Sequence, residues 1–280
     1  MQSIKIPNKA LLDKKIEQFK KHGVKGFHVV ADFDRTLTKG FNKGRKIQSS
    51  YSYIRDGNYL TPDYAAKSYK LFDEYHPIEI DPSIFMDIKI KKMEEWWELH
   101  YSLQIACGIT KEVFQDIIAK NKIEFRNGTL TFLDTLSRNN IPLLIFSAGQ
   151  GDTIKECLAH KNKLTQNIHL ISNFFIFDKN GKAIGYTKPL VHTFNKNEEQ
   201  VKNHPYQKEI KERKNVLLLG DSVGDVTMAQ GLSHNTIIKI GFLNEKADAL
   251  LPEFEKHFDI IILNDGSMEE VNKIINEIMS

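Results

Sequence analysis

Short, nearly continuous hydrophobic runs recur along the chain and are separated by segments with helical periodicity. Such runs predict strands buried on both faces, because half-buried strands would alternate hydrophobic and polar residues. We expect six of them, at His28–Ala31, Leu143–Phe146, Ile168–Ile171, Val216–Leu219, Ile237–Ile240 and Ile260–Leu263. Helical patterns lie at Leu130–Asn139, Asp152–His160 and Asp225–Leu232. This alternation is typical of a doubly wound α/β fold with a parallel sheet.

Two segments depart from this alternation. Phe174–Ile184 carries Asn180-Gly181 between two hydrophobic stretches, a pair that can take positive φ at both turn positions, and therefore predicts a β-hairpin. Over a hundred residues separate the first two expected strands, far more than one crossover helix needs. Helical patterns with polar faces fill this stretch, at Pro62–Glu74, Ile84–Ala106 and Lys111–Lys120. We therefore expect a mainly helical cap at residues 41–125, inserted into a core formed by residues 1–40 and 126–280.

Composition narrows the classes of partner. The 280 residues carry a net charge of only +3, and the lysines are spread along the chain, so no basic patch for nucleic acid is indicated. No hydrophobic stretch reaches the roughly 20 residues of a membrane helix, and the first residues lack the apolar region of a signal peptide. Cys107 and Cys157 form no CxxC pair. A reducing cytoplasm is the expected location; a monomer is compatible with the sequence, which leaves the oligomeric state open.

Paired carboxylates follow two of the expected strands. Asp32 and Asp34 come directly after the first strand, and Asp221 and Asp225 follow the strand at Val216–Leu219. Ligands bind at the carboxyl ends of strands in open α/β sheets, so the two pairs would meet there. Such a cluster needs a cation, and oxygen ligands favour Mg²⁺. One isolated pair would be equally well explained as a turn or a helix cap; two pairs favour a metal site.

Two further polar residues suit phosphate chemistry. Ser147 ends the strand at Leu143–Phe146 and begins Ser147-Ala148-Gly149-Gln150, where a hydroxyl and free N–H groups can hold phosphate oxygens. Taken alone, Ser147 would be better explained as a helix cap. Lys196 offers an ammonium that can neutralise a phosphate, although most lysines are merely solvated and Lys188 is also available.

These residues together resemble the haloacid dehalogenase superfamily of phosphatases. The resemblance rests on DxDxT at Asp32–Thr36, then Ser147, a later lysine, and GDSxxD at Gly220–Asp225, in the order of that superfamily. Four further segments resemble the pyrimidine 5′-nucleotidase family, also called cytosolic 5′-nucleotidase type III: Tyr75–Pro82, Ile145–Gly149, Val191–Lys196 and Ile240–Asn244. Its Phe-Asn-Lys element, at Phe194–Lys196, favours Lys196 over Lys188. The resemblance runs from about Phe27 to near the C-terminus.

The resemblance implies a Rossmann-like haloacid dehalogenase core and a catalytic mechanism. Asp32 would attack phosphorus to form an aspartyl-phosphate, while Asp34 would protonate the leaving nucleoside and then activate water. Mg²⁺ would be held by Asp32, the Asp34 backbone carbonyl, Asp221 and Asp225. The phosphate would contact Ser147, Ala148 and Lys196, and Thr36 would orient the loop.

The resemblance also assigns base selection to the cap. Glu79, from the family's Ile-Glu-Ile-Asp-Pro element, can accept a hydrogen bond from an exocyclic amine; without the resemblance it is an ordinary helix-end charge. Paired tryptophans are usually core residues, but Trp97 becomes a candidate platform for the base, one that would favour a cationic methylated purine. At His100 the family has a small hydroxyl residue that contacts substrate. His100 would bind the base, crowd it, or be only a surface side chain.

We expect a Mg²⁺-dependent 5′-nucleotidase that hydrolyses nucleoside 5′-monophosphates such as UMP, CMP or 7-methylguanosine monophosphate. Three alternatives stay open. One is a phosphatase of another small metabolite, such as phosphoserine. Another is phosphotransfer to a second nucleoside. The third is a non-catalytic nucleotide-binding module, which the presence of Asp32, Asp34 and Asp221 disfavours.

Overall fold

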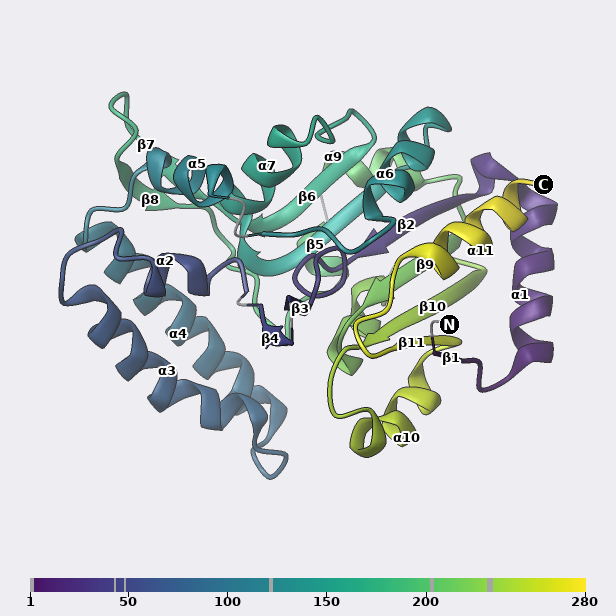
Figure 1. Ribbon diagram of the computed structural model, residues 1–280, viewed down its shortest axis with the longest axis horizontal. Coiled ribbons are helices and arrows are strands. Elements are labelled where there is room, and N and C mark those ends of the chain that lie inside the picture. Colours follow the sequence, from purple (N-terminus) through teal and green to yellow (C-terminus); the bar gives the residue numbers. More distant parts are fainter. Residues whose placement is uncertain (1–2, 43, 48, 121–122, 202–203, 231–233) are drawn as a thin grey trace.

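A seven-stranded sheet forms the centre of the protein (Figure 1). The computed structural model describes residues 3–42, 44–47, 49–120, 123–201, 204–230 and 234–280. The strand order is β1-β11-β10-β9-β2-β5-β6, and every neighbouring pair is parallel except β1 with β11. The strands are β1 (Ile4–Lys5), β2 (Phe27–Ala31), β5 (Leu143–Gln150), β6 (Ile168–Asn173), β9 (Asn215–Gly220), β10 (Thr236–Leu243) and β11 (Ile260–Leu263).

The six strands expected from the hydrophobic runs are all present, so the prediction of a mostly parallel α/β sheet is confirmed. Most are longer than predicted, because strand pairing continues into polar residues such as those at the end of β5. The antiparallel edge strand β1 was not predicted. Two residues are too few to leave a periodic pattern, and Ile4 finds its partner Ile262 at the other end of the chain.

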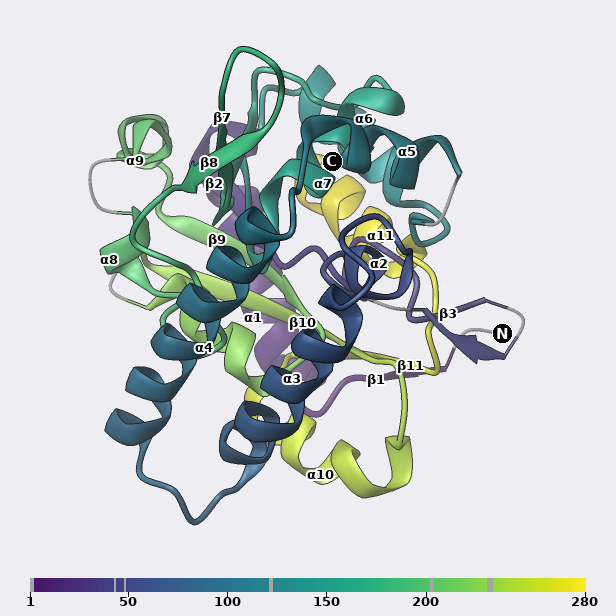
Figure 2. The same cartoon turned by 90° about the vertical axis from the view of Figure 1, so that its left-hand side faces the viewer.

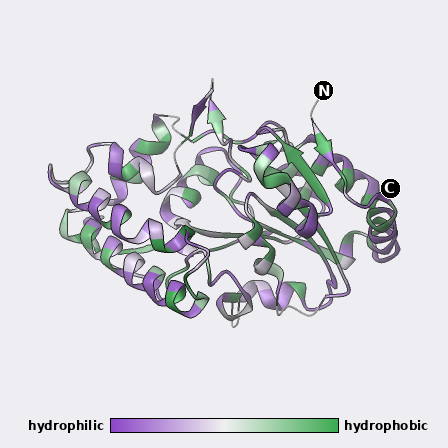
Figure 3. Cartoon of the chain, turned by 90° about the horizontal axis from the view of Figure 1, so that it is seen from below, coloured by the Kyte–Doolittle hydropathy of each residue, from purple (hydrophilic) through white to green (hydrophobic). Residues whose placement is uncertain are grey.

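Helices cover both faces of the sheet. Successive side chains of β2 point to opposite faces: Val29 and Ala31 pack in one hydrophobic cluster and Val30 in the other. Helices α1 (Lys9–His22), α6 (Thr129–Arg138), α7 (Gly151–His160) and α11 (Glu269–Met279) contribute to the first cluster, and α8 (Glu198–Val201), α9 (Pro205–Ile210) and α10 (Ala247–His257) to the second. The strands of the sheet are largely hydrophobic, and the helices mix hydrophilic and hydrophobic residues (Figure 3). Every helix in the described ranges falls short of the length or hydrophobicity that a bilayer crossing demands.

The helix expected at Asp225–Leu232 differs from the prediction. A 3-10 helix, η2, covers Val223–Ala229 instead, and the predicted end at Leu232 lies outside the described residues. It begins earlier because Ser222 and Asp225 form a capping box, in which each side chain accepts a hydrogen bond from the other residue's backbone N–H. The tight first turn holds Asp225 next to the end of β9.

The predicted hairpin is present as the antiparallel pair β7 (Phe175–Phe177) and β8 (Ala183–Tyr186). Its turn is longer than a two-residue Asn-Gly turn, and only Gly181 has a positive φ, of 78°. The Asp178 carboxylate accepts hydrogen bonds from the N–H groups of Asn180 and Lys182, at 2.8 and 2.9 Å, and thereby closes this wider turn. The predicted hairpin is therefore confirmed, although Asn180 does not take the positive φ that an Asn-Gly turn allows.

The insertion between β2 and β5 is mainly helical, as predicted. It contains α2 (Ser52–Asp56), α3 (Tyr64–Ile80), α4 (Met86–Ala106) and α5 (Lys111–Ala119), besides the short strands β3 (Phe41–Asn42) and β4 (Arg45–Lys46). Helices α3 and α4 run side by side, away from the sheet (Figure 1, Figure 2). Tyr75 and Trp96 stack between these helices with ring centroids 5.9 Å apart.

The chain leaves and re-enters the sheet domain at one place. Thr38 and Phe125 form an antiparallel bridge, Lys39 N–H donates to Glu124 O at 3.0 Å, and Arg126 N–H donates to Leu37 O at 2.9 Å. The outgoing and returning segments therefore run side by side. The division into a core and a cap at residues 41 and 125 stays a prediction, because Tyr64, Tyr101 and other side chains of the insertion belong to the same hydrophobic cluster as the sheet.

A buried histidine in β2 predicts loss of stability in acid. His28 is 1% exposed and lies within hydrogen-bonding distance of the Tyr206 hydroxyl, which donates to Val29 O. Burial lowers the pKa of His28 to about 3 from 6.5. The unfolded chain therefore binds a proton below pH 6.5 that the folded chain does not bind until about pH 3, so stability falls as the pH drops through this window.

We expect wild-type protein to lose about 2 kcal/mol of unfolding free energy through His28 between pH 7 and pH 5. His28→Gln should remove that share, so the difference in unfolding free energy between the two pH values should shrink by this amount. Urea unfolding at both pH values measures it, with His160→Gln, an exposed site on α7, as control. An unchanged pH dependence in His28→Gln would contradict the prediction.

Candidate active site

Three neighbouring strands bring the predicted site residues together. In the order β9-β2-β5, Asp221 follows β9, Asp32 follows β2, and Ser147 lies within β5, all toward the carboxyl ends of the strands. The N–H of Asp32 donates to Leu219 O at 3.0 Å, which extends the pairing of β2 with β9 by one residue. Phe33 points into the core and is fully buried, which leaves Asp32 and Asp34 free of the hydrophobic side.

Lys196 forms the centre of a buried charge cluster. Its ammonium nitrogen lies 2.5 Å from an Asp32 oxygen and 3.0 Å from an Asp225 oxygen. All three residues are 6% exposed or less. Burial raises the pKa of Asp32 to about 7, the Lys196 ammonium opposes this rise, and the Asp225 charge adds to it. Lys188, by contrast, is exposed. Its ammonium nitrogen lies 2.5 Å from a Glu98 oxygen, and this ion pair is not part of the buried cluster.

Three carboxylates can hold a cation at this point. One oxygen from each of Asp32, Asp221 and Asp225 lies within 4.8 Å of the others. Burial, together with the charges of Asp225 and Asp32, raises the pKa of Asp221 well above its usual range. Three carboxylates face a single ammonium, so a divalent cation would offset the excess negative charge. The donor set consists of oxygens only, which suits a hard metal ion.

Asp34 points to a different partner from Asp32. The N–H and the hydroxyl of Ser50 donate to its two carboxylate oxygens, at 2.9 and 2.8 Å. Burial raises the pKa of Asp34, and the two bonds from Ser50 oppose the rise. The next residue, Arg35, has a φ of 61°, so the chain turns sharply after Asp34. Ser50 was not predicted to belong to the site, since it lies in a stretch without periodicity.

The segment after Ser147 lies beside these carboxylates. Ser147 is 2% exposed, and its hydroxyl accepts a hydrogen bond from Gly149 N–H at 3.0 Å. A Cβ atom on Gly149 would lie 2.5 Å from the Ser50 hydroxyl, 2.9 Å from Asp34 and 3.2 Å from the Ser147 hydroxyl. Only glycine therefore lets these three side chains converge. The carbonyl of Ala148 accepts from Asn173 Nδ2 at 3.0 Å.

Two residues of the helical insertion contact the rest of the protein beside this segment. Trp97 Nε1 donates to Ala148 O at 3.2 Å, and its ring lies edge-on against Trp96. The Glu79 carboxylate accepts from the Thr193 hydroxyl at 2.7 Å and lies 3.0 Å from His76 Nδ1. Thr193 belongs to the loop that leads to Lys196, so both contacts join the cap to segments that bear predicted phosphate-binding residues.

His100, in α4 of the insertion, is a buried residue. It is 1% exposed, its Nδ1 is hydrogen-bonded to the Tyr51 hydroxyl, and its Nε2 lies 3.4 Å from the Tyr64 hydroxyl. Burial lowers the pKa of His100 well below its usual range, so the ring is neutral. The surface interpretation is therefore wrong, while contact with the base stays a prediction.

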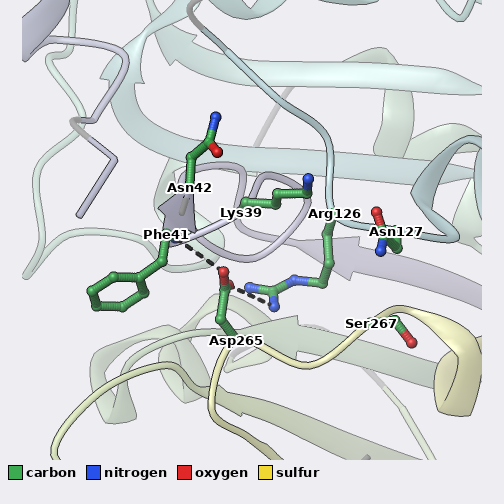
Figure 4. A pocket seen from close by; sticks show the side chains of 7 residues that line it. All are labelled: Lys39, Phe41, Asn42, Arg126, Asn127, Asp265 and Ser267. Carbon is green, nitrogen blue, oxygen red and sulfur yellow. Dashed lines mark hydrogen bonds and ion pairs between the residues drawn. The ribbon is translucent and has the colours of Figure 1, made fainter. Parts of the chain in front are cut away.

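Arg126 braces the loop that follows Asp34, a role that the sequence did not suggest. This residue is 2% exposed and also lines a pocket of about 180 Å³ (Figure 4). Its guanidinium donates to Thr36 O at 3.0 Å, Gly266 O at 2.5 Å, Arg35 O, the Asp265 carboxylate at 3.0 Å and the Asn244 side chain at 3.0 Å. All five N–H donors are thereby used. Burial lowers the pKa of Arg126 to about 10, so it remains charged at neutral pH.

Known proteins share this fold. The structure superimposes on crystalline cytosolic 5′-nucleotidase IIIB bound to cytidine with a TM-score of 0.88 and 30% identity, covering 98% of this chain and 93% of that one. A phosphoserine phosphatase, 17% identical, has a TM-score of 0.52 over 88% of this chain and 97% of its own, which shows a shared haloacid dehalogenase-like fold alone.

Sequence relatives agree with the structural match. The 7-methylguanosine phosphate-specific 5′-nucleotidase A of Xenopus laevis is 37% identical over 94% of this chain and 91% of its own length. The 7-methylguanosine phosphate-specific 5′-nucleotidase of Homo sapiens is 34% identical over 93% and 87%. The model of the family described as Pyrimidine 5′-nucleotidase (UMPH-1) matches residues 35–279. The chain therefore belongs to the pyrimidine 5′-nucleotidase family and is a 5′-nucleotidase, a phosphomonoesterase.

Proposed function

We propose that this protein hydrolyses nucleoside 5′-monophosphates of pyrimidines, such as UMP and CMP, or of 7-methylguanosine, through an aspartyl-phosphate on Asp32. The buried cluster of Asp32, Lys196 and Asp225 carries the proposal, because a nucleophilic carboxylate beside an ammonium suits a phosphoryl group. One relative has a crystal structure with bound cytidine, and another is named as specific for 7-methylguanosine phosphate. Both support the substrate class. Two relatives have names that contain the word cytosolic, which supports a cytoplasmic location.

Two carboxyl groups divide the reaction. An Asp32 oxygen forms a bond to phosphorus as the bond from phosphorus to the 5′ oxygen breaks, and Asp34 gives its proton to that oxygen. In the second step Asp34 takes a proton from water, and the resulting hydroxide displaces Asp32 from phosphorus. Inorganic phosphate leaves, and both carboxyl groups return to their starting states.

The remaining residues bind and orient the phosphate. The ammonium of Lys196, the hydroxyl of Ser147 and the Ala148 backbone would hold its oxygens, and Thr36 would orient the loop. Asp32, the Asp34 backbone carbonyl, Asp221 and Asp225 would hold Mg²⁺, which the all-oxygen donor set favours. When bound, the ion would neutralise phosphate charge in the transition state.

The cap would recognise the base. Glu79 lies at the end of α3 near the loop that carries Lys196, and Trp97 touches the segment after Ser147. A carboxylate can accept a hydrogen bond from the exocyclic amine of cytosine or guanine. The indole of Trp97 would offer a face to the base, and His100, packed against Tyr51, would limit the depth of the base pocket.

A panel of UMP, CMP, dTMP, GMP, 7-methylguanosine monophosphate and phosphoserine tests the proposal. We expect phosphate release from at least one of the first two or from the methylated purine, loss of release with EDTA, and recovery with Mg²⁺. Turnover of phosphoserine alone would overturn the proposed substrate class. Full activity in EDTA after dialysis would overturn the proposed metal.

Replacing Trp97 tests the proposed base platform. Trp97→Leu should lower kcat/KM for 7-methylguanosine monophosphate about 10-fold more than for UMP, since only the methylated purine is cationic. Trp97→Phe keeps an aromatic face and should lose much less. Disturbance of the Ala148 contact affects both substrates equally and cancels in the ratio. An unchanged substrate ratio in Trp97→Leu would remove Trp97 from base recognition.

A further inference from the structure

Ser50 makes a paired contact with the proposed general acid. Its backbone N–H donates to one oxygen of Asp34 at 2.9 Å, and its hydroxyl donates to the other at 2.8 Å. Two bonds to two oxygens fix both the position and the plane of a carboxyl group, whereas one bond would leave it free to rotate. Each oxygen keeps a further lone pair, so the carboxyl can still carry or transfer a proton.

The hydroxyl of Ser50 is itself oriented. Gln150 N–H donates to it at 3.3 Å, so a lone pair of the hydroxyl is occupied and its single hydrogen is directed to Asp34. Ser50 is fully buried, which excludes competing water contacts at the side chain. Gly149 provides the space for this arrangement, because a Cβ atom there would lie 2.5 Å from the hydroxyl.

The residue after Ser50 is anchored in the cap. The Tyr51 hydroxyl is hydrogen-bonded to His100 Nδ1, and the two rings lie 3.9 Å apart between centroids. His100 belongs to α4, the helix that also carries Trp97. Adjacent residues therefore connect Asp34 on one side with a cap helix on the other.

We propose that Ser50 is a positioning residue that aims the Asp34 carboxyl at the leaving oxygen of the substrate. The inference rests on the proposed function, in which Asp34 protonates that oxygen. Loss of the Ser50 hydroxyl leaves one bond, from the backbone, and allows the carboxyl to turn. The rate of the first chemical step should then fall most for substrates whose leaving group needs a proton.

Two substrates with different leaving groups separate this role from a structural one. The leaving group of a nucleoside monophosphate is a basic alkoxide, which needs the proton. The leaving group of 4-nitrophenyl phosphate is 4-nitrophenolate, a stable anion that leaves without it. Ser50→Ala should lower kcat/KM for the nucleoside monophosphate about 10- to 100-fold and leave first-turnover release of 4-nitrophenolate within about 3-fold of wild type. Ser50→Thr keeps the hydroxyl and should recover most of the nucleotide activity.

Two controls accompany this test. Ser49→Ala removes the neighbouring hydroxyl, which contacts Ser52 instead of Asp34, and should change neither substrate. Release of 4-nitrophenolate by Ser50→Ala also reports that the variant is folded. Equal losses on both substrates, or no loss on either, would overturn the inference.

Asp34→Asn separates failure of the inference from failure of the proposed mechanism. This variant should show the same dependence on the leaving group, and more strongly than Ser50→Ala. If Asp34→Asn showed the dependence and Ser50→Ala did not, only the role of Ser50 would fall. If Asp34→Asn showed no such dependence, the proposed acid would be wrong, whatever Ser50 does.

Discussion

Asp32→Asn should abolish turnover of nucleoside monophosphates, lowering kcat by at least about 10⁴-fold. An amide oxygen is a poor nucleophile toward phosphorus and cannot form the aspartyl-phosphate. The substitution nearly preserves volume, and Lys196 keeps its contact with Asp225 at 3.0 Å, so the buried cluster should stay folded. Phosphate release under saturating substrate and Mg²⁺ measures the loss.

Asp248→Asn, at an exposed position on α10, is the matched control and should keep full activity. Thermal unfolding of both variants should resemble that of wild type, which would assign the loss in Asp32→Asn to chemistry. Turnover by Asp32→Asn within about 10-fold of wild type would exclude Asp32 as the nucleophile. Mass spectrometry of wild-type protein quenched in acid should detect the added phosphoryl group, and the variant should lack it.

Arg126→Met should destabilise the fold by about 3 to 5 kcal/mol. The substitution removes five donors from acceptors that are buried or partly buried, and leaves the Asp265 carboxylate without its guanidinium partner at 3.0 Å. That carboxylate also accepts from the N–H groups of Gly40 and Phe41, at 2.8 and 2.9 Å, so it cannot easily turn to solvent. Methionine fills much of the volume, which limits the cavity and isolates the polar loss.

Urea unfolding measures this change as a shift in the midpoint at constant slope. Arg138→Met removes an exposed arginine at the end of α6 and should change stability by less than about 0.5 kcal/mol. Activity provides a second measurement, since Arg126 holds the carbonyls of Arg35 and Thr36 directly after Asp34. Wild-type stability in Arg126→Met would show that the network around Asp265 contributes nothing net to folding.

The strands and the acidic pairs could be predicted because each leaves a local signature. The run at Ile260–Leu263 matches β11 residue for residue, because four consecutive hydrophobic residues fit a strand that is buried on both faces. Asp32 and Asp221 could be assigned to one site because parallel strands end at a common edge. The family resemblance then separated Lys196 from Lys188, which no local pattern does.

Residues that act through distant partners could not be predicted in the same way. Arg126 meets Asp265 across 139 positions of sequence, and neither residue stands in a recognisable motif. Ser50 contacts Asp34 from 16 positions away, within a segment that has no helical or strand period. The burial of His100 depends on hydroxyls from Tyr51 and Tyr64, and such pairings become visible only when the helices are packed.

The side-by-side path of the outgoing and returning segments has a consequence for how this enzyme can evolve. Because Thr38 and Phe125 pair directly, the ends of the insertion are held at a fixed short separation whatever its length. Additional residues within it change the loop-closure entropy only slowly, so helices such as α3 and α4 can lengthen, shorten or exchange residues at small cost in stability. Selection for a new base can therefore act on α3 and α4, while Asp32 and Asp221, which directly follow strands β2 and β9, stay in place. Substitutions in α3 and α4 can thus change which base is bound without replacing the carboxylates that follow the strands.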